Sequence, residues 1–95
     1  MSTLPKKLIL LGSGELGKEI AIAAQRLSCK VIACDRYKDA PAMQIADVAE
    51  ILDMSNPATL KQVIYKHKPD AVIPEIEALA VNSLNEIEEN GIQVI

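Results

Sequence analysis

Hydrophobic and polar residues follow two different patterns along this chain. Short aliphatic runs with few polar interruptions are typical of strands buried on both faces of a sheet, whereas apolar residues three or four positions apart are typical of amphipathic helices. The short runs predict five strands, at residues 6–11, 30–34, 48–52, 70–73 and 92–95. The helical spacing predicts three helices, at residues 15–27, 57–68 and 77–90.

The predicted helices are bounded by residues that commonly start or stop helices. Asn56 is a good N-cap before Pro57, Pro69 ends the second helix, and Gly91 suits the C-cap of the third. Each helix has an apolar face that is expected to turn inward. These faces consist of Leu16, Ile20, Ala23, Ala24 and Leu27 in the first helix, Leu60, Val63, Ile64 and His67 in the second, and Ala80, Leu84 and Ile87 in the third.

Strands that alternate with helices predict an α/β domain. The right-handed crossover rule favours a parallel sheet of five strands with helices on both faces, a three-layer, Rossmann-like arrangement with strand order 3-2-1-4-5. The 95 residues suffice for one domain, residues 1–95. Because the sequence stops within an aliphatic strand, we expect it to be the first segment of a longer protein.

The composition of the chain argues against several classes of function. The net charge is −3, the ten Lys and Arg residues are scattered, and the only aromatic residues are Tyr37 and Tyr65, so we expect no nucleic-acid partner. Its apolar runs are too short for a membrane span or a signal peptide, which predicts a cytoplasmic protein. Cys29 and Cys34 have neither zinc-site nor disulfide spacing, so we expect reduced structural thiols and no metal site. The single histidine, His67, is expected to pack against the core.

The turn after the first strand carries the clearest motif. It has the pattern G-x-G-x-x-G, built by Gly12, Ser13, Gly14, Glu15, Leu16 and Gly17. The motif follows a strand, opens a helix, and precedes an acid, Asp35, by 18 residues. These are the elements of a dinucleotide fingerprint, so an NAD(P) site is one interpretation. The segment Asp35-Arg36-Tyr37 could touch a ribose or simply end the second strand.

Glu15 argues against a dinucleotide. A pyrophosphate would rest on the free N–H groups at the helix N-terminus, where Glu15 places a carboxylate of the same charge. Even at an effective dielectric of about 20, two unit charges about 4 Å apart repel by roughly 4 kcal/mol. The turn therefore favours a ligand with hydrogen-bond donors, such as an amine, an amide N–H or ribose hydroxyls. The alternative is that Glu15 is an acid that merely suits the first turn of a helix.

A second acid follows the fourth strand. Glu75 is expected at the carboxyl edge of the sheet, where open α/β domains bind their ligands. With strands one and four adjacent, Glu15 and Glu75 would line one crevice and form an acidic pocket for donors. Glu77 is better explained as an acid at the start of a helix.

Three stretches of the chain resemble one enzyme family: residues 12–19 (GSGELGKE), 35–43 (DRYKDAPAM) and 74–78 (PEIEA). They are similar to the N-terminal, pre-ATP-grasp domain of formate-dependent phosphoribosylglycinamide formyltransferases, which belong to the ATP-grasp superfamily and act in purine synthesis. The resemblance runs over essentially the whole chain. It implies that Glu15, Leu16 and Glu75 contact glycinamide ribonucleotide, that the glycines and Ser13 support the turn, and that this segment holds no catalytic residue.

The resemblance also implies the partners. The family couples ATP and formate to formyl phosphate, which the amine of glycinamide ribonucleotide then attacks. ATP and Mg²⁺ would bind outside this segment, the enzyme would be a homodimer, and residues 1–95 alone would be inactive. The family often has glycine at the position of Ser28, so a positive φ there would be mildly strained.

Three other interpretations stay open. A sibling family, the ATP-dependent carboxylase of aminoimidazole ribonucleotide, typically has Gln at the position of Glu15 and an aromatic residue within the motif at 74–78. The remaining two are an NAD(P)-binding domain and a binding module without catalysis.

Overall fold

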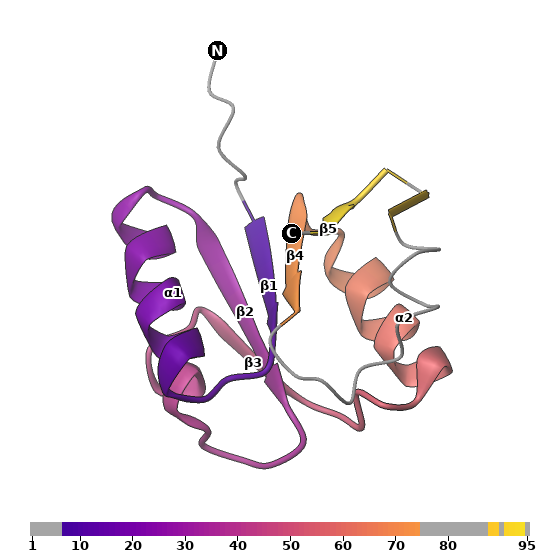
Figure 1. Ribbon diagram of the computed structural model, residues 1–95, viewed down its shortest axis with the longest axis horizontal. Coiled ribbons are helices and arrows are strands. Elements are labelled where there is room, and N and C mark those ends of the chain that lie inside the picture. Colours follow the sequence, from indigo (N-terminus) through magenta and orange to yellow (C-terminus); the bar gives the residue numbers. More distant parts are fainter. Residues whose placement is uncertain (1–6, 75–87, 90, 95) are drawn as a thin grey trace.

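The computed structural model describes residues 7–74, 88–89 and 91–94 (Figure 1). Its elements are β1 (Lys7–Leu11), α1 (Glu15–Arg26), β2 (Lys30–Asp35), the 3₁₀ helix η1 (Pro41–Gln44), β3 (Val48–Ile51), α2 (Pro57–His67), β4 (Ala71–Pro74) and β5 (Gln93–Val94). The helix expected over residues 77–90 lies outside the described residues except at 88–89. The η1 helix occupies part of the segment between β2 and β3 that carried no periodic pattern.

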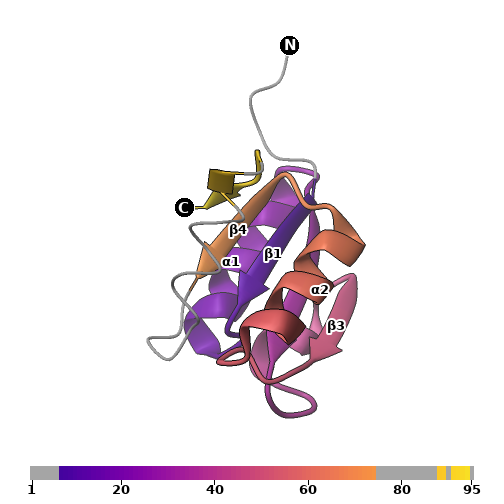
Figure 2. The ribbon, with the colours of Figure 1, turned by 90° about the vertical axis from the view of Figure 1, so that its right-hand side faces the viewer.

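All described strands pair in parallel, in the order β3-β2-β1-β4-β5. The central strand β1 has β2 on one side and β4 on the other (Figures 1 and 2). The predicted α/β class, the parallel sheet and the order of the first four strands are confirmed. β5 adds two described residues, Gln93 and Val94, which pair with Ala71 and Val72.

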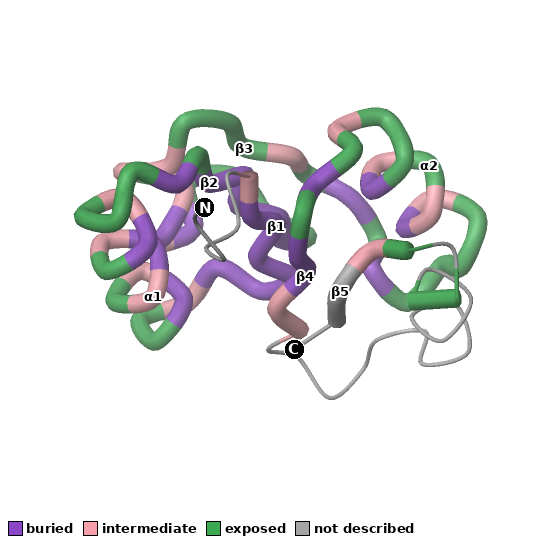
Figure 3. The backbone as a smooth tube through the Cα atoms, turned by 90° about the horizontal axis from the view of Figure 1, so that it is seen from above, coloured by how far each residue is buried: buried purple, intermediate pink, exposed green. Residues whose placement is uncertain are grey.

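Alternate strand residues face opposite sides of the sheet and build two apolar cores. The core under α2 contains Ile9, Leu11, Ile32, Cys34, Val72, Leu60 and Ile64. The core under α1 contains Leu8, Leu10, Val31, Ala33, Ala71, Ala21 and Ala24. In Figure 3 the buried strands lie between the two helices. The described part of the domain therefore has the three layers that the sequence predicts.

The buried face of α1 differs from the one expected. Its buried residues are Gly17, Ala21 and Ala24. Leu16 is 63% exposed and Leu27 is 55% exposed, so the prediction that both face inward was wrong. Ala23 is exposed as well. Small side chains let the helix approach the sheet closely, and the third glycine of a G-x-G-x-x-G turn commonly serves this purpose.

The start of α2 is as the sequence predicts. The side-chain oxygen of Asn56 accepts hydrogen bonds from the backbone N–H groups of Ala58 at 3.0 Å and Thr59 at 3.2 Å. This satisfies two donors that the first helical turn would otherwise leave unpaired. Leu60 and Ile64 then face the core.

Ser28, in the turn after α1, has the positive φ that was considered for it from the sequence. Its φ is +67°, in the left-handed region that favours glycine. The N–H of Ser28 donates to the carbonyl of Gln25, and the N–H of Cys29 donates to the carbonyl of Ala24, both at 3.0 Å. This pattern is a Schellman C-cap, which needs a left-handed residue at the position that Ser28 occupies.

Candidate functional site

The carboxyl ends of β1 and β4 lie next to each other. Leu10 pairs with Ile73, and Leu11 pairs with Pro74, so the glycine-rich turn begins beside the last residue of β4. The prediction that the turn and the end of the fourth strand share one edge of the sheet is confirmed as far as Pro74. Glu75, the next residue in the sequence, lies outside the described residues.

Glycine is required where the turn leaves β1. Gly12 has a φ of +113°, which residues with a Cβ atom rarely adopt. Its N–H donates to the carbonyl of Cys34 at 2.9 Å and keeps the turn against the end of β2. Gly14 is the N-cap of α1 and has no side chain with which to cap the helix. The first N–H groups of α1 therefore receive no cap from that position.

Ser13 lies between these two glycines and is fully buried. Its N–H donates to Oδ2 of Asp35 at 2.9 Å, and its hydroxyl donates to the carbonyl of Cys34 at 2.8 Å. Its carbonyl accepts a hydrogen bond from the N–H of Ala42, in η1, at 2.8 Å. The end of β2 and the start of η1 thus hold the turn through one residue.

Asp35 uses its carboxylate inside the protein. The residue is 5% exposed, Oδ2 accepts from Ser13, and Oδ1 accepts from the N–H of Arg36 at 2.7 Å. A buried carboxylate needs such donors to offset the loss of water. In a dinucleotide-binding domain, an acid at this point binds a ribose hydroxyl instead. The interior bonds of Asp35 therefore argue, together with Glu15, against a dinucleotide.

Glu15 and Leu16 are exposed at the start of α1, directly after this turn. Among the described residues, the carboxylate of Glu15 has no hydrogen-bond or ion-pair partner. An exposed carboxylate next to a leucine that is 63% exposed presents one acidic and one apolar surface. The pair suits a ligand that carries hydrogen-bond donors next to carbon-rich surface.

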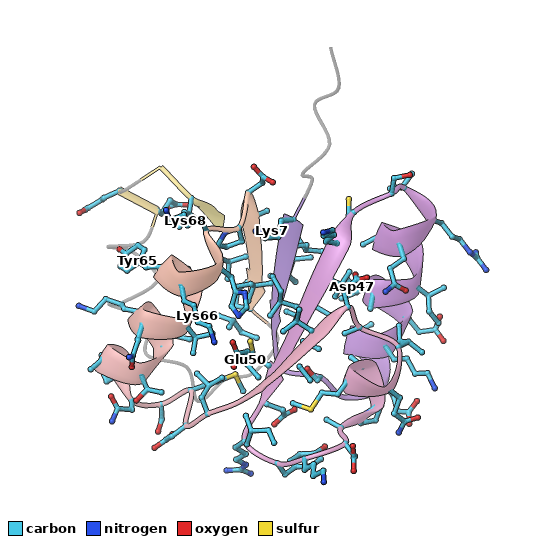
Figure 4. All side chains as sticks on the ribbon, turned by 180° about the vertical axis from the view of Figure 1, so that it is seen from behind. Lys7, Asp47, Glu50, Tyr65, Lys66 and Lys68 are labelled. Atoms are coloured by element: carbon cyan, nitrogen blue, oxygen red, sulfur yellow. The ribbon has the colours of Figure 1, made fainter. Side chains whose placement is uncertain are left out.

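A polar cluster lies between β3 and α2. Glu50 accepts a hydrogen bond from Nζ of Lys66 at 3.1 Å and is also hydrogen-bonded to Nε2 of His67. Figure 4 shows Glu50 and Lys66. The hydrogen bond with His67 is the main cause that lowers the pKa of Glu50, and Lys66 adds to it. Nζ of Lys7 donates to the carbonyl of His67 at 2.8 Å. His67 is half-buried, and its ring is hydrogen-bonded to Glu50, a polar partner that the apolar pattern of the helix did not predict.

The two cysteines are free and buried. Burial raises the pKa of Cys34 to about 12, and the charges of Glu50 and Asp35 add to the effect. Since the thiolate is the reactive form, the raised pKa and the burial both disfavour reaction of Cys34 in the folded protein. Within residues 7–74 and the described parts of 88–94, no three His, Cys, Asp or Glu side chains are grouped so that they could hold a metal ion.

Residues 5–95 match the family model of the ribonucleotide synthetase preATP-grasp domain. The chain belongs to this family. The candidate site of this preATP-grasp domain is built on its parallel sheet, the central strand β1 and the glycine-rich turn before α1. No helix in the described part of this domain is long and apolar enough to cross a membrane.

Two curated relatives of this preATP-grasp domain have the same name. Proteins of Prochlorococcus marinus (strain MIT 9313) and Synechococcus sp. (strain WH7803) are 70% and 67% identical to it over 95 residues. Both are named formate-dependent phosphoribosylglycinamide formyltransferase. The match includes the whole of this chain and 24% of each relative, so the chain spans about a quarter of their length.

Solved structures show the same fold. Glycinamide-RNase-transformylase T from Mycobacterium tuberculosis matches 93% of this preATP-grasp domain with a TM-score of 0.89 and 36% identity, over 25% of its own chain. N5-carboxyaminoimidazole synthetase from Staphylococcus aureus, complexed with ADP, matches 94% with a TM-score of 0.80 and 25% identity, over 23% of its own chain.

Sequence reasoning located the turn but missed what holds it. The role of Asp35 stayed open, and Ser13 was only one member of a supporting loop. The position of Asp35 was itself an indication, because an acid at the end of an apolar strand needs hydrogen-bond donors if it is buried. The bond from Ala42 to Ser13 had no such signal, since η1 reaches the turn only through the folding of the chain after β2.

Proposed function

We propose that this chain is the N-terminal, substrate-side domain of a formate-dependent phosphoribosylglycinamide formyltransferase. The observation that carries the proposal is the 70% identity along the whole chain to a relative of that name. The exposed Glu15 and Leu16 support it, because they stand at the edge of the sheet where α/β domains bind ligands.

In this proposal the domain binds glycinamide ribonucleotide and leaves bond-making to the rest of the enzyme. Glu15 and Glu75 accept hydrogen bonds from donors of the ribonucleotide, and Leu16 packs against it. The complete enzyme transfers the γ-phosphoryl group of ATP to formate, which gives ADP and formyl phosphate. The amine of the ribonucleotide then attacks the formyl carbon, phosphate leaves, and the amine loses a proton.

The proposal places ATP and Mg²⁺ outside residues 1–95. The described residues have no grouping of His, Cys, Asp and Glu that fits a metal ion. This chain corresponds to 23% of the Staphylococcus aureus synthetase whose structure contains ADP. The rest of that protein has room for a separate nucleotide-binding domain. We further propose that the complete enzyme is a cytoplasmic homodimer.

The sibling carboxylase of aminoimidazole ribonucleotide is the second candidate. The fold similarity to the Staphylococcus aureus synthetase favours it, but the identity of 25% is lower than the 36% to the Mycobacterium tuberculosis transformylase. Glu15 also favours the formyltransferase, because the carboxylase family typically has Gln there.

The test is an assay of the protein that carries this chain at its N-terminus. With ATP, Mg²⁺, ¹⁴C-formate and glycinamide ribonucleotide, we expect radioactive formylglycinamide ribonucleotide and an equal amount of ADP. A parallel reaction with aminoimidazole ribonucleotide and bicarbonate is expected to give no ADP above background. ADP formation in the second reaction alone would replace the formyltransferase with the carboxylase.

A further inference from the structure

We propose that Asp35 is a positioning residue for the ribonucleotide: it fixes the glycine-rich turn so that Glu15 and Leu16 meet the ligand, and does not touch the ligand itself. This inference rests on the proposed function and deepens it. In a dinucleotide-binding domain, the acid at the position of Asp35 would bind the ribose. In this protein, Asp35 would instead hold the glycine-rich turn in place.

Both carboxylate oxygens of Asp35 accept hydrogen bonds from within the protein. The residue is 5% exposed, and its two oxygens accept from the N–H groups of Ser13 and Arg36 at 2.9 and 2.7 Å. Each oxygen thus already accepts a backbone N–H group, and the burial of Asp35 leaves little of the carboxylate open to a ribose hydroxyl.

The turn depends on such an anchor because of its composition. Ser13 is flanked by Gly12 and Gly14, and glycine is the residue with the most backbone freedom. Without bonds at Ser13, the segment between β1 and α1 would sample many conformations. Glu15 is two residues beyond Ser13, so the position of Ser13 sets where the first turn of α1 begins.

A turn that Asp35 holds in place should bind the ribonucleotide more tightly than a free turn. A loop that is already held in its bound conformation loses less conformational freedom when the ligand arrives. We therefore expect Asp35 to govern the KM for the ribonucleotide, while ATP and formate, which bind elsewhere in the proposed enzyme, are unaffected.

The test is Asp35→Asn in the full-length protein. Asn keeps the shape but replaces one acceptor oxygen with an NH₂ group that would face a backbone N–H. We expect the KM for glycinamide ribonucleotide to rise about tenfold or more, equivalent to ~1.4 kcal/mol. The KM values for ATP and formate should change less than about twofold. Ser13→Ala, which removes only the hydroxyl bond to Cys34, should give a smaller rise in the same KM and covers the case that the Asn variant does not fold.

The chain offers a matched control at the other end of β2. Oδ2 of Asp47 accepts a hydrogen bond from the N–H of Val31 at 2.8 Å, so Asp47→Asn disrupts a bond of the same chemical kind, from a more exposed carboxylate, away from the turn. It should lower thermal stability but leave the ribonucleotide KM unchanged. An equal rise in that KM for the Asp35 and Asp47 variants would overturn the proposal, because both would then act through general stability.

Two further measurements separate positioning from direct contact and from failure of the proposed function. A 2′-deoxy analogue of the ribonucleotide should lose affinity by the same factor in wild type and Asp35→Asn. Strong coupling between the two changes would show direct contact and overturn the proposal.

If the wild type transfers no formyl group, the proposed function fails. Amide hydrogen exchange over residues 12–16 then decides for Asp35: faster exchange in Asp35→Asn than in Asp47→Asn supports the anchor, and equal exchange overturns it.

Discussion

Leu11 on β1 and Pro74 on β4 are paired residues of two parallel strands, and each is followed by a segment that we propose binds the ribonucleotide. Proline has no N–H group, so β4 cannot donate a hydrogen bond at this position. Because Leu11 pairs with Pro74, the glycine-rich turn leaves β1 beside the last described residue of β4. The two segments that we propose bind the ribonucleotide thus follow neighbouring strands in the sequence.

Glu75→Gln should weaken binding of glycinamide ribonucleotide in the full-length protein. A hydrogen bond to a charged group contributes roughly 1.5–3 kcal/mol, so removal of the charge should lower affinity roughly 10–150-fold. Steady-state kinetics with each substrate varied in turn should show this in the ribonucleotide KM, with little change for ATP or formate.

The matched control for that experiment is Glu77→Gln, since Glu77 is interpreted as an acid at the start of a helix. It should leave the ribonucleotide KM unchanged. If Glu75→Gln lowers kcat severely while the ribonucleotide KM stays the same, Glu75 acts in catalysis and its assignment to binding is wrong.

NADH and NADPH should not bind this domain, despite the G-x-G-x-x-G pattern. Glu15 adds a carboxylate at the first residue of α1, the helix end on which a pyrophosphate would rest, and Asp35 already accepts hydrogen bonds from Ser13 and Arg36. Titration calorimetry of the protein with each cofactor should give no heat of binding. A dissociation constant in the low micromolar range would mean that Glu15 turns away from the ligand.

Glu50→Gln should make the stability of the protein less dependent on pH. The bond with His67 and the approach of Lys66 lower the pKa of Glu50 in the folded state below its ordinary value of 4.5. A group with a lowered folded-state pKa stabilises the protein above the unfolded-state pKa, and this contribution is lost as the pH falls through the folded-state pKa. We expect the variant to be less stable by about 1–2 kcal/mol at neutral pH and the difference to shrink in acid.

Urea unfolding of both proteins between neutral pH and pH ~3 measures this difference. Glu19→Gln is the control, because it removes one carboxylate from an exposed position on α1. A gap between wild type and Glu50→Gln that stays constant down to the acid end would show that the ionised form of Glu50 does not stabilise the fold.

Ser28→Gly should stabilise the protein. Ser28 has a φ of +67°, where a residue with a Cβ atom is strained by roughly 1 kcal/mol and glycine is not. Thermal unfolding should show a higher Tm for Ser28→Gly and no increase for Ser28→Ala, which keeps the Cβ atom. A lower Tm for the glycine variant would mean that its extra freedom in the unfolded chain outweighs the relief of strain.

Features that depend on neighbouring residues could be predicted from the sequence. Asn56 and the N–H groups that it caps are two and three residues apart, and Gly12 stands at the end of an aliphatic run. Such contacts form within one turn of chain, so the residue types and their spacing are enough to predict them. The alternation of strands and helices predicted the parallel order of the first four strands in the same way, because crossovers have one favoured hand.

Features that join distant residues were decided by the tertiary structure. Ser13 and Asp35 are 22 residues apart, and Glu50 and His67 are 17 residues apart. The local sequence does not predict the partner in either bond, because each bond exists only after β2 or β3 has been placed beside its neighbour. The exposure of Leu16 has the same origin: apolar spacing alone puts it inside, but close packing of α1 through its small residues leaves it at the surface, beside the acid that precedes it.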